Sequence, residues 1–372
     1  QKNATFMVSG SDGLLKYNGT TITKITLSTA QVQVQGPFIE VWKSRLYSLL
    51  PDESNTSVYA SALNDETTWP GANKLDVSDP EGGEITGIAA REDLLIVLKK
   101  TSLWRLLGDL TQRFQFIRYC EFGCVAPLSV QKSPYGVWFV SRDGVYLTDG
   151  QSPIPVEASG PMRALFVSRG DETVYDGAVG LWSQRKQAYY LKLQPTASAG
   201  YAIYARQSTE GVQLAWASYP SLPMNCGAVW ESEEDEGRVF VGDRTGIVYE
   251  IDTGTVDGTA TITTTLQTAS IPFDPKSQTI GRAQYVKSLY RGADTLSVGL
   301  RYDNATSGDV TVTLGTTGAA SLDNPRAVVS NQSNHGQYLS LTAQSTGGSD
   351  FELYRLETDD ALRGPRLWRY SG

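Results

Sequence analysis

The sequence predicts an all-β protein, with a β-propeller of five to seven blades followed by a C-terminal β-sandwich. The first observation behind this prediction is a recurring hairpin, in which an apolar strand, an Asp-Gly or Gly turn and an aromatic-rich strand follow one another. It occurs over Thr5–Gly19 and Val137–Gly150, and in a longer form over Arg238–Gly254. The second observation is that the hairpin disappears after Gly258. One hairpin repeated along a chain indicates a radially repeated or stacked β unit.

Composition agrees with this fold class. Of the 372 residues, 40% are hydrophobic and 10% aromatic, which excludes wholesale disorder. The 36 glycines and 19 tyrosines favour turns and strands over helices. The longest aliphatic run, Leu94–Leu98, is far shorter than the roughly 20 residues of a membrane-spanning helix. We therefore expect no membrane span.

Six β units can be marked before residue 258, and their spacing of about 40 residues is that of a four-stranded propeller blade. The alternative of two β-sandwiches predicts less regular spacing. One short helix is expected at Pro161–Phe166, because proline suits a first helical turn. The units cover Ala4–Ile25, Phe38–Ser61, Ile85–Leu106, Leu128–Leu147, Val179–Trp216 and Gly227–Ile251. Five tryptophans at comparable places in them are expected to pack between blades: Trp104, Trp138, Trp182, Trp216 and Trp230.

After Gly258 the strands alternate between hydrophobic and polar residues, as one layer of a sandwich requires. The sequence thus predicts two domains, a propeller at residues 1–257 and a β-sandwich assembly domain at 258–372. The predicted strands of the second domain are Thr259–Ser270, Ala283–Tyr290, Leu296–Tyr302, Val310–Leu314, Tyr338–Thr342 and Phe351–Leu356.

Residues for catalysis are scarce. The single histidine, His335, lies in a polar stretch and has no serine elbow to serve in a Ser-His-Asp triad. Several propellers are glycosidases that use paired carboxylates, and the candidates here are Glu40, Asp143, Asp176 and Asp243. Asp143 and Asp176 precede glycines, where aspartate is a common turn residue. We expect no catalytic residue and no enzymatic activity.

Metal and cofactor sites are not expected either. The cysteines Cys120, Cys124 and Cys226 are too few for a disulfide framework, and we expect buried free thiols. No phosphate-binding glycine loop is present. The net charge of −8 predicts no general attraction to nucleic-acid phosphate.

Several segments resemble the propeller region of bacteriophage tail hub and nozzle proteins. They are Ser57–Ser61 with Trp69, Glu84–Leu106, Glu121–Val130 and Gly136–Tyr146. The family includes tail tubular protein B and the packaged-DNA stabilisation proteins of short-tailed phages. The resemblance implies a structural virion protein in the phage tail, arranged as a homohexameric ring below the portal and adaptor. Its implied partners are the adaptor and a fibre or needle protein, and DNA would leave through the ring without sequence-specific binding. No functional residue is carried over from the family.

Two other functions fit the sequence. A carbohydrate-binding or carbohydrate-active propeller would use aromatic side chains to stack on sugars. A secreted adhesion propeller would carry glycans on its Asn-x-Ser/Thr sequons, which lie at Asn3, Asn18, Asn55, Asn304 and Asn331.

The C-terminal segment is the candidate interface with other subunits or the adaptor. It concentrates arginine and aromatic residues, the types enriched at interface hot spots. The residues are Arg363, Arg366, Trp368, Arg369 and Tyr370. The alternative is a final sandwich strand with solvated arginines.

Overall fold

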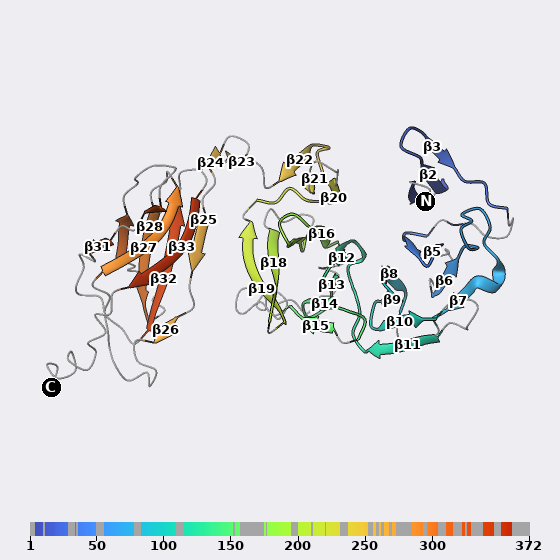
Figure 1. Ribbon diagram of the computed structural model, residues 1–372, viewed down its shortest axis with the longest axis horizontal. Helices are drawn as coiled ribbons and strands as arrows, with labels where there is room; N and C mark the ends of the chain where they lie inside the picture. Colours follow the sequence, from blue (N-terminus) through green and yellow to red (C-terminus); the bar gives the residue numbers. More distant parts are fainter. Residues whose placement is uncertain are drawn as a thin grey trace. The chain divides into compact units, whose positions relative to one another are not determined.

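A computed structural model gives the fold of the chain (Figure 1). It divides into two compact units, residues 1–252 and 253–372. In the first unit the structure describes residues 4–9, 12–28, 34, 36–49, 56–77, 83–108, 115–151, 153–156, 175, 177–194, 200–209, 211–219, 221–230 and 237–251. In the second it describes residues 256–257, 260–261, 264–267, 270–272, 285–292, 296–303, 310–314, 322–323, 326–328, 338–345 and 351–358.

The described part of the first unit contains six antiparallel sheets, each a meander of strands consecutive in sequence (Figure 1). The first sheet is β1–β3 (Thr5–Ser9, Gly13–Tyr17, Ile22–Lys24), and the second is β4–β7 (Ile39–Trp42, Arg45–Leu49, Ser57–Ala60, Lys74–Asp76). The third is β8–β11 (Ile85–Arg91, Leu94–Lys99, Leu103–Leu107, Gln115–Cys120), and the fourth is β12–β15 (Gln131–Ser133, Gly136–Val140, Val145–Thr148, Pro153–Pro155). The fifth is β16–β19 (Val179–Ser183, Ala188–Lys192, Gly200–Ser208, Gly211–Tyr219), and the sixth is β20–β22 (Cys226–Trp230, Arg238–Gly242, Val248–Ile251).

Short turns join β1 to β2, β4 to β5 and β21 to β22. Gly13 and Gly246 have φ angles of 79° and 88°, in the left-handed region that an L side chain adopts only with strain. The turn between β4 and β5 reaches the same region without glycine, since Lys43 and Ser44 have φ angles of 45° and 59°. Two consecutive positive φ angles are those of a type I′ hairpin turn.

Successive sheets pack face to face because both faces of the inner sheets are apolar. Strand β9 shows the rule: Leu95 and Val97 belong to the buried cluster shared with the second sheet, whereas Ile96 and Leu98 belong to the cluster shared with the fourth. Strand side chains alternate between faces, so an unbroken apolar run fills two interfaces at once. Within residues 1–252, five clusters of described residues join the six sheets in order.

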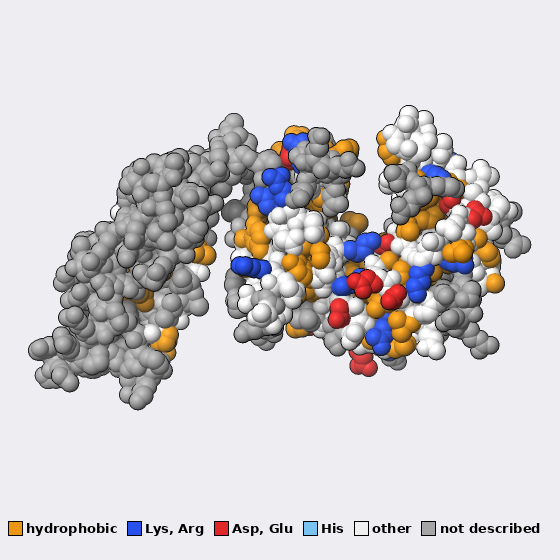
Figure 2. All heavy atoms as spheres, viewed as in Figure 1, with side chains coloured by type: hydrophobic (Ala, Val, Ile, Leu, Met, Phe, Trp, Pro, Cys, Tyr) orange, Lys and Arg blue, Asp and Glu red, His pale blue; other side chains and the backbone are white. Residues whose placement is uncertain are grey.

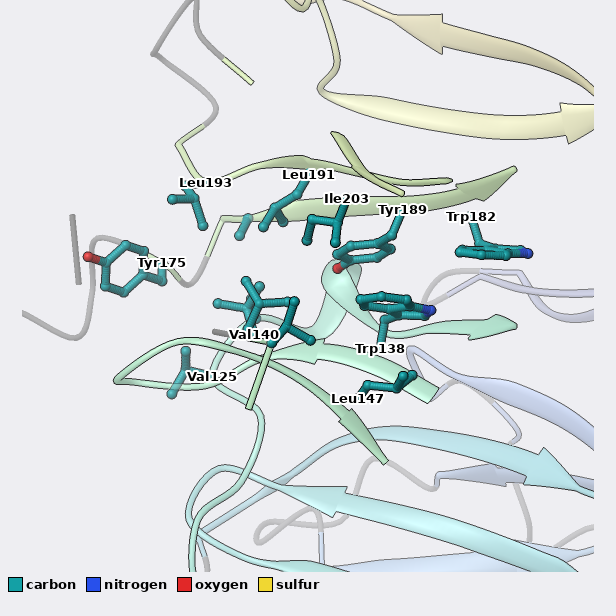
Figure 3. Packing of buried hydrophobic residues seen from close by; sticks show 14 of the residues in the cluster. Val125, Trp138, Val140, Leu147, Tyr175, Trp182, Tyr189, Leu191, Leu193 and Ile203 are labelled. Atoms are coloured by element: carbon teal, nitrogen blue, oxygen red, sulfur yellow. The ribbon is translucent and has the colours of Figure 1, made fainter. Parts of the chain in front are cut away.

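The cluster between the fourth and fifth sheets is built on stacked rings (Figure 3). The centroid of Trp138 lies 5.9 Å from that of Trp182 and 5.0 Å from that of Tyr189, with interplanar angles of 18° and 10°. The Tyr189 hydroxyl donates a hydrogen bond of 2.7 Å to the carbonyl oxygen of Ser129, in the 3₁₀ turn Pro127–Ser129. This bond ties the fifth sheet to the segment that leads into the fourth.

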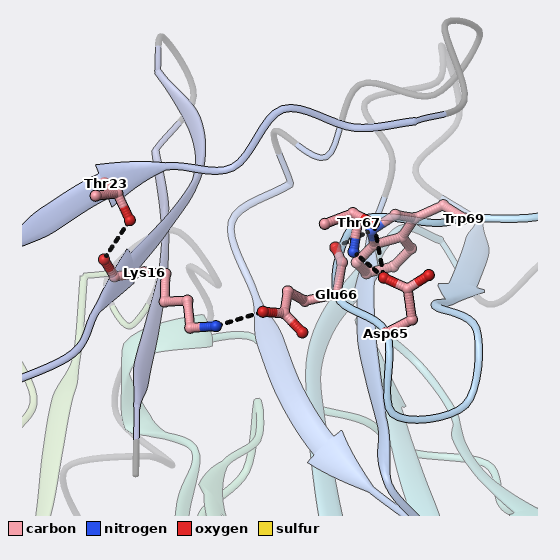
Figure 4. Close-up of polar contacts among 6 residues, drawn as sticks. All are labelled: Lys16, Thr23, Asp65, Glu66, Thr67 and Trp69. Atoms are coloured by element: carbon pink, nitrogen blue, oxygen red, sulfur yellow. Dashed lines mark hydrogen bonds and ion pairs between the residues drawn. The ribbon is translucent and has the colours of Figure 1, made fainter. Parts of the chain in front are cut away.

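The first and second sheets are joined by apolar and polar contacts. Leu14 and Trp69 lie in one buried cluster, and Lys16 forms an ion pair with Glu66 (Figure 4). In the same loop Asp65 accepts hydrogen bonds from its threonine neighbours. The side-chain hydrogen bond from Thr68, followed by those from Thr67, lowers the pKa of Asp65 from 3.8 to about 2.

The described strands of the second unit form two larger sheets and one short strand pair, β23–β24 (Val256–Asp257, Ala260–Thr261). One large sheet has the order β25-β32-β28-β29, with β26 also paired to β32; the other has β27 paired to β30, β31 and β33. Strand β28 alternates between buried and half-buried residues along its length, as expected for a sandwich layer. These strands are β25 (Thr264–Gln267), β26 (Ile271–Pro272), β27 (Tyr285–Gly292), β28 (Leu296–Tyr302), β29 (Val310–Leu314), β30 (Leu322–Asp323), β31 (Arg326–Val328), β32 (Tyr338–Ser345) and β33 (Phe351–Thr358).

The predicted fold class, an all-β chain with a propeller followed by a sandwich, is confirmed. Some details of the prediction are wrong. The expected strand at Leu128–Val130 is a 3₁₀ turn, because Pro127 lacks the N–H that a strand would use. Trp230 is 63% exposed instead of packed between blades. The expected helix at Pro161–Phe166 lies outside the described residues.

Candidate binding groove

Part of the predicted site falls outside the described residues. All five candidate interface residues lie there, namely Arg363, Arg366, Trp368, Arg369 and Tyr370, as do His335 and Asp176. Their roles remain predictions from the sequence.

The described carboxylates that were weighed for glycosidase chemistry are each engaged locally. Glu40 accepts a 2.9 Å hydrogen bond from the Lys132 ammonium, and Asp143 accepts one of 2.8 Å from the Tyr146 hydroxyl. Asp243 closes the turn before β22, accepting hydrogen bonds from Thr245 and from the backbone N–H of Ile247. The Thr245 hydrogen bond contributes most to lowering the pKa of Asp243. The contacts of Asp243 favour its ionised form, whereas a general acid must hold its proton.

The thiols do not form a site together. Cys120 and Cys124 are buried, and burial raises the pKa of Cys124 to about 11, which keeps it a neutral thiol. Cys226 is exposed, contrary to the prediction of three buried thiols, because it lies on the outer side of the sixth sheet. Within the described ranges there is no group of three or more His, Cys, Asp or Glu side chains able to hold a metal ion. Nor does any described helix have the length and hydrophobicity to cross a membrane.

An open groove of about 740 Å³ lies where the fourth and fifth sheets meet at one end of the strands. Its lining comes from the β12–β13 turn, the β16–β17 turn and the hairpin of β18 and β19. The lining residues are Tyr135, Lys186, Gln187, Tyr204, Ala205, Arg206, Gln213, Leu214 and Ala215. Figure 2 shows Lys and Arg side chains beside hydrophobic ones over the region of β18 and β19.

The side chains at one wall of the groove are held in place. Tyr135 packs edge-on against Trp182, with ring centroids 5.9 Å apart, and its hydroxyl donates a 2.7 Å hydrogen bond to Oε1 of Gln187. Gln187 is fixed in turn, because its Nε2 donates to the carbonyl of Gln184 and its own carbonyl accepts from the N–H of Ala205. A preformed wall lowers the entropy lost when a ligand binds.

The lining side chains can stack on a ligand, hydrogen-bond it and pair with its negative charge. It combines the Tyr135 ring and its amide partner with the exposed cations Lys186 and Arg206 and the exposed amide of Gln213. Among the described lining residues there is no carboxylate. The groove therefore offers aromatic, amide and cationic contacts, but no pair of carboxylates for glycoside hydrolysis.

Sequence reasoning did not find this groove. Its residues come from two turns and from β18 and β19, the last two strands of the fifth sheet, and no spacing in the sequence links Tyr135 to Arg206. The available signal was the density of aromatic and long polar residues between Tyr201 and Trp216.

Comparison with known proteins gives similarity of fold alone. No family model and no curated protein sequence matches the chain. Among solved structures it is similar to a glycoside hydrolase family 43 arabinoxylan arabinofuranohydrolase from Bacillus subtilis, at 11% identity over 93% of this chain and 73% of that one, with a TM-score of 0.26.

Two further structures are similar over most of this chain. The extracellular domain of a one-component system from B. thetaiotaomicron is 12% identical, over 86% of this chain and 46% of that one, with a TM-score of 0.40. PorZ of the Porphyromonas gingivalis type-IX secretion system is 13% identical, over 83% and 45%, with a TM-score of 0.32. The chain thus spans less than half the length of both proteins.

Proposed function

We propose that the propeller is a carbohydrate-binding module that takes an acidic glycan in the groove of the fourth and fifth sheets and does not hydrolyse it. The observation that carries the proposal is the lining: a fixed tyrosine ring, two amides and two cations, without a carboxylate among the described residues. A sugar ring stacks on an aromatic face through its C–H groups, and amides hydrogen-bond its hydroxyls. The cations select a carboxylated or sulfated sugar, although the whole chain has a net charge of −8.

Direct binding measurements test this function. The probes are a trigalacturonic acid and a neutral galactose trisaccharide, titrated into the full chain by calorimetry. Arg206→Ala should weaken binding of the acidic probe about 10- to 100-fold, because a charge-assisted hydrogen bond contributes about 1.5–3 kcal/mol. Arg244→Ala, which removes an exposed arginine from the β21–β22 turn, is the matched control and should leave affinity unchanged.

Tyr135→Phe separates the wall of the groove from its charge. It removes the hydroxyl that holds Gln187 and keeps the ring on Trp182. It should weaken binding of both probes by a similar factor, because the freed Gln187 amide must be reordered when either probe binds and no charge is involved. Absence of binding to an array that includes acidic and neutral glycans at millimolar concentration would contradict the proposal, and release of reducing sugar would contradict its non-catalytic part.

A second candidate function is that of a structural subunit in a bacteriophage tail, in a hexameric ring with adaptor and fibre or needle partners. The segments that resemble tail hub and nozzle proteins support it; they correspond to β6, β8–β10, the 3₁₀ turn Pro127–Ser129 and β13–β14. Electron microscopy of virions labelled with an antibody to the chain tests this role. Label at the tail is expected, and virions without label there would refute it.

A further inference from the structure

Lys192 is buried almost completely between the fifth and sixth sheets. It is the last residue of β17, and it is 5% exposed. It follows Tyr190 by two residues, so both side chains point to the face that packs on the sixth sheet. Lysine is rarely buried to this extent unless a group of opposite charge accompanies it.

The Lys192 ammonium has few partners at this position. Among the described residues it makes one hydrogen bond, to Oδ1 of Asn225 at 3.4 Å, which is longer than usual for such a bond. An ammonium can donate three hydrogen bonds, so two donors have no partner in the part of the chain that the structure describes. No described carboxylate forms an ion pair with it. Burial of a charge without a counter-charge destabilises a fold.

A second cation lies beside Lys192 on the sixth sheet. Asn225 precedes β20, and its N–H donates a 2.8 Å hydrogen bond to the carbonyl oxygen of Gly242, at the start of the turn that carries Asp243 and Arg244. Arg244 is exposed and Asn225 half-buried, so this cluster reaches the surface. Burial, followed by the positive charge of Arg244, lowers the pKa of Lys192, whereas Asp243 acts in the opposite direction.

Asp243 does not neutralise this charge fully, because the β21–β22 turn uses its carboxylate. Oδ1 accepts a hydrogen bond of 2.8 Å from the N–H of Thr245, and Oδ2 accepts one of 2.9 Å from the Thr245 hydroxyl. The Arg244 guanidinium and Nδ2 of Asn225 have no hydrogen-bond partner within the described ranges. The cluster of Lys192, Arg244 and Asp243 thus keeps a net positive charge.

We propose that Lys192, Arg244 and Asn225 form a binding site for a phosphate or sulfate group. The group would supply the counter-charge that Lys192 lacks and accept hydrogen bonds from the ammonium, the guanidinium and the amide. Two cations and donors on three side chains match a doubly charged group with three free oxygens better than a flat, singly charged carboxylate.

This oxyanion site is separate from the glycan groove. Gln187, which lines the groove, precedes β17, whereas Lys192 ends that strand, about 15 Å further along it. The proposal therefore depends on neither a glycan in the groove nor a place in a phage tail.

Calorimetric titration of the full chain with inorganic phosphate and with glucose 6-phosphate tests the site. The wild type should bind at least one of these probes, and Lys192→Met and Arg244→Ala should each weaken that binding about 10- to 100-fold, because each removes a charge-assisted hydrogen bond. Arg206→Ala removes the arginine of the groove and is the matched control, with affinity for phosphate as in the wild type. Tighter binding of the ester would assign the group to a larger molecule, and binding of inorganic phosphate alone would assign it to a free ion; either result supports the site.

Thermal unfolding separates a binding role from a structural one. Lys192→Met keeps a long side chain and removes the buried charge, so without phosphate it should melt at or above the wild-type temperature. Phosphate should raise the melting temperature of the wild type and leave that of Lys192→Met unchanged, because a ligand stabilises only the protein that binds it. An equal rise in both would be the general effect of phosphate on protein stability and would overturn the proposal. A wild type that binds neither probe at about 10 mM would overturn it as well, as would affinity that survives both substitutions.

Discussion

Two adjacent tyrosines of β17 offer a controlled test of what holds the fourth and fifth sheets together. Tyr189 and Tyr190 are both fully buried, and they point to opposite faces of the sheet. The Tyr189 hydroxyl donates to the carbonyl oxygen of Ser129 at 2.7 Å, whereas the buried Tyr190 hydroxyl has no hydrogen-bond partner among the residues that the structure describes. Replacing each by phenylalanine removes one oxygen atom and keeps the ring, so the two variants differ in a single hydrogen bond.

The free energy of unfolding should fall for Tyr189→Phe but not for Tyr190→Phe. Tyr189→Phe leaves a buried carbonyl without this donor, which costs about 1–3 kcal/mol. Tyr190→Phe removes a hydroxyl whose unpaired burial already costs roughly 1–3 kcal/mol, so stability should stay the same or rise. With a urea dependence of about 1–3 kcal/mol per molar, the midpoint for Tyr189→Phe should fall by about 1 M.

Urea unfolding followed by tryptophan fluorescence measures both variants, since Trp138 and Trp182 lie in the affected cluster. Equal losses of stability in the two variants would refute the reasoning, because they would assign the effect to ring packing. A loss for Tyr190→Phe alone would refute it as well.

Three further predictions concern the same unit. Asp65→Asn should make the free energy of unfolding depend less on pH between 4 and 2. The pKa of Asp65 falls from 3.8 to about 2 on folding, so its carboxylate contributes fully to stability above pH 4 and this contribution is lost as pH drops towards 2. Urea midpoints across that range measure the effect. In dilute native protein Cys226 should react with Ellman's reagent at once, whereas Cys124, fully buried with a pKa raised to about 11, should react only after unfolding. Gly123→Ala should lower the melting temperature by several degrees or prevent folding, because its Cβ would lie 1.9 Å from the carbonyl oxygen of Lys99.

The repeated hairpin was sufficient to predict the propeller, because each of its signals is local. Asp-Gly and Gly turns bounded by apolar strands set φ angles and strand direction without reference to the rest of the chain. The edge strands carried weaker signals. Strand β15, Pro153–Pro155, holds two prolines, which lack the N–H of a central strand and are tolerated at a sheet edge. Strand β7, Lys74–Asp76, is three residues long, and its first and last residues are charged.

The errors at Trp230 and Cys226 have one cause. An apolar strand has the same sequence pattern whether a tryptophan in it meets another sheet or solvent. Among the described residues of 1–252, the sixth sheet shares a buried cluster on one face, with the fifth sheet. Which face is covered depends on where the series of sheets ends, a property of the whole chain. The groove escaped prediction for a similar reason, because Tyr135 and Arg206 meet only after the fourth and fifth sheets have packed.

The division of the core into five shared clusters gives the first unit the cooperativity of a one-dimensional array. Among the described residues of 1–252, each inner sheet shares buried clusters with two neighbours, but the first and sixth sheets share one cluster each. The free energy of local opening should therefore be smallest at the two ends and greatest around β13 and β17. The rate of amide hydrogen exchange should then fall from the terminal sheets towards the inner ones. A molecule bound to either terminal sheet would slow exchange at that end first, because it would give that sheet the second packed face that each inner sheet already has.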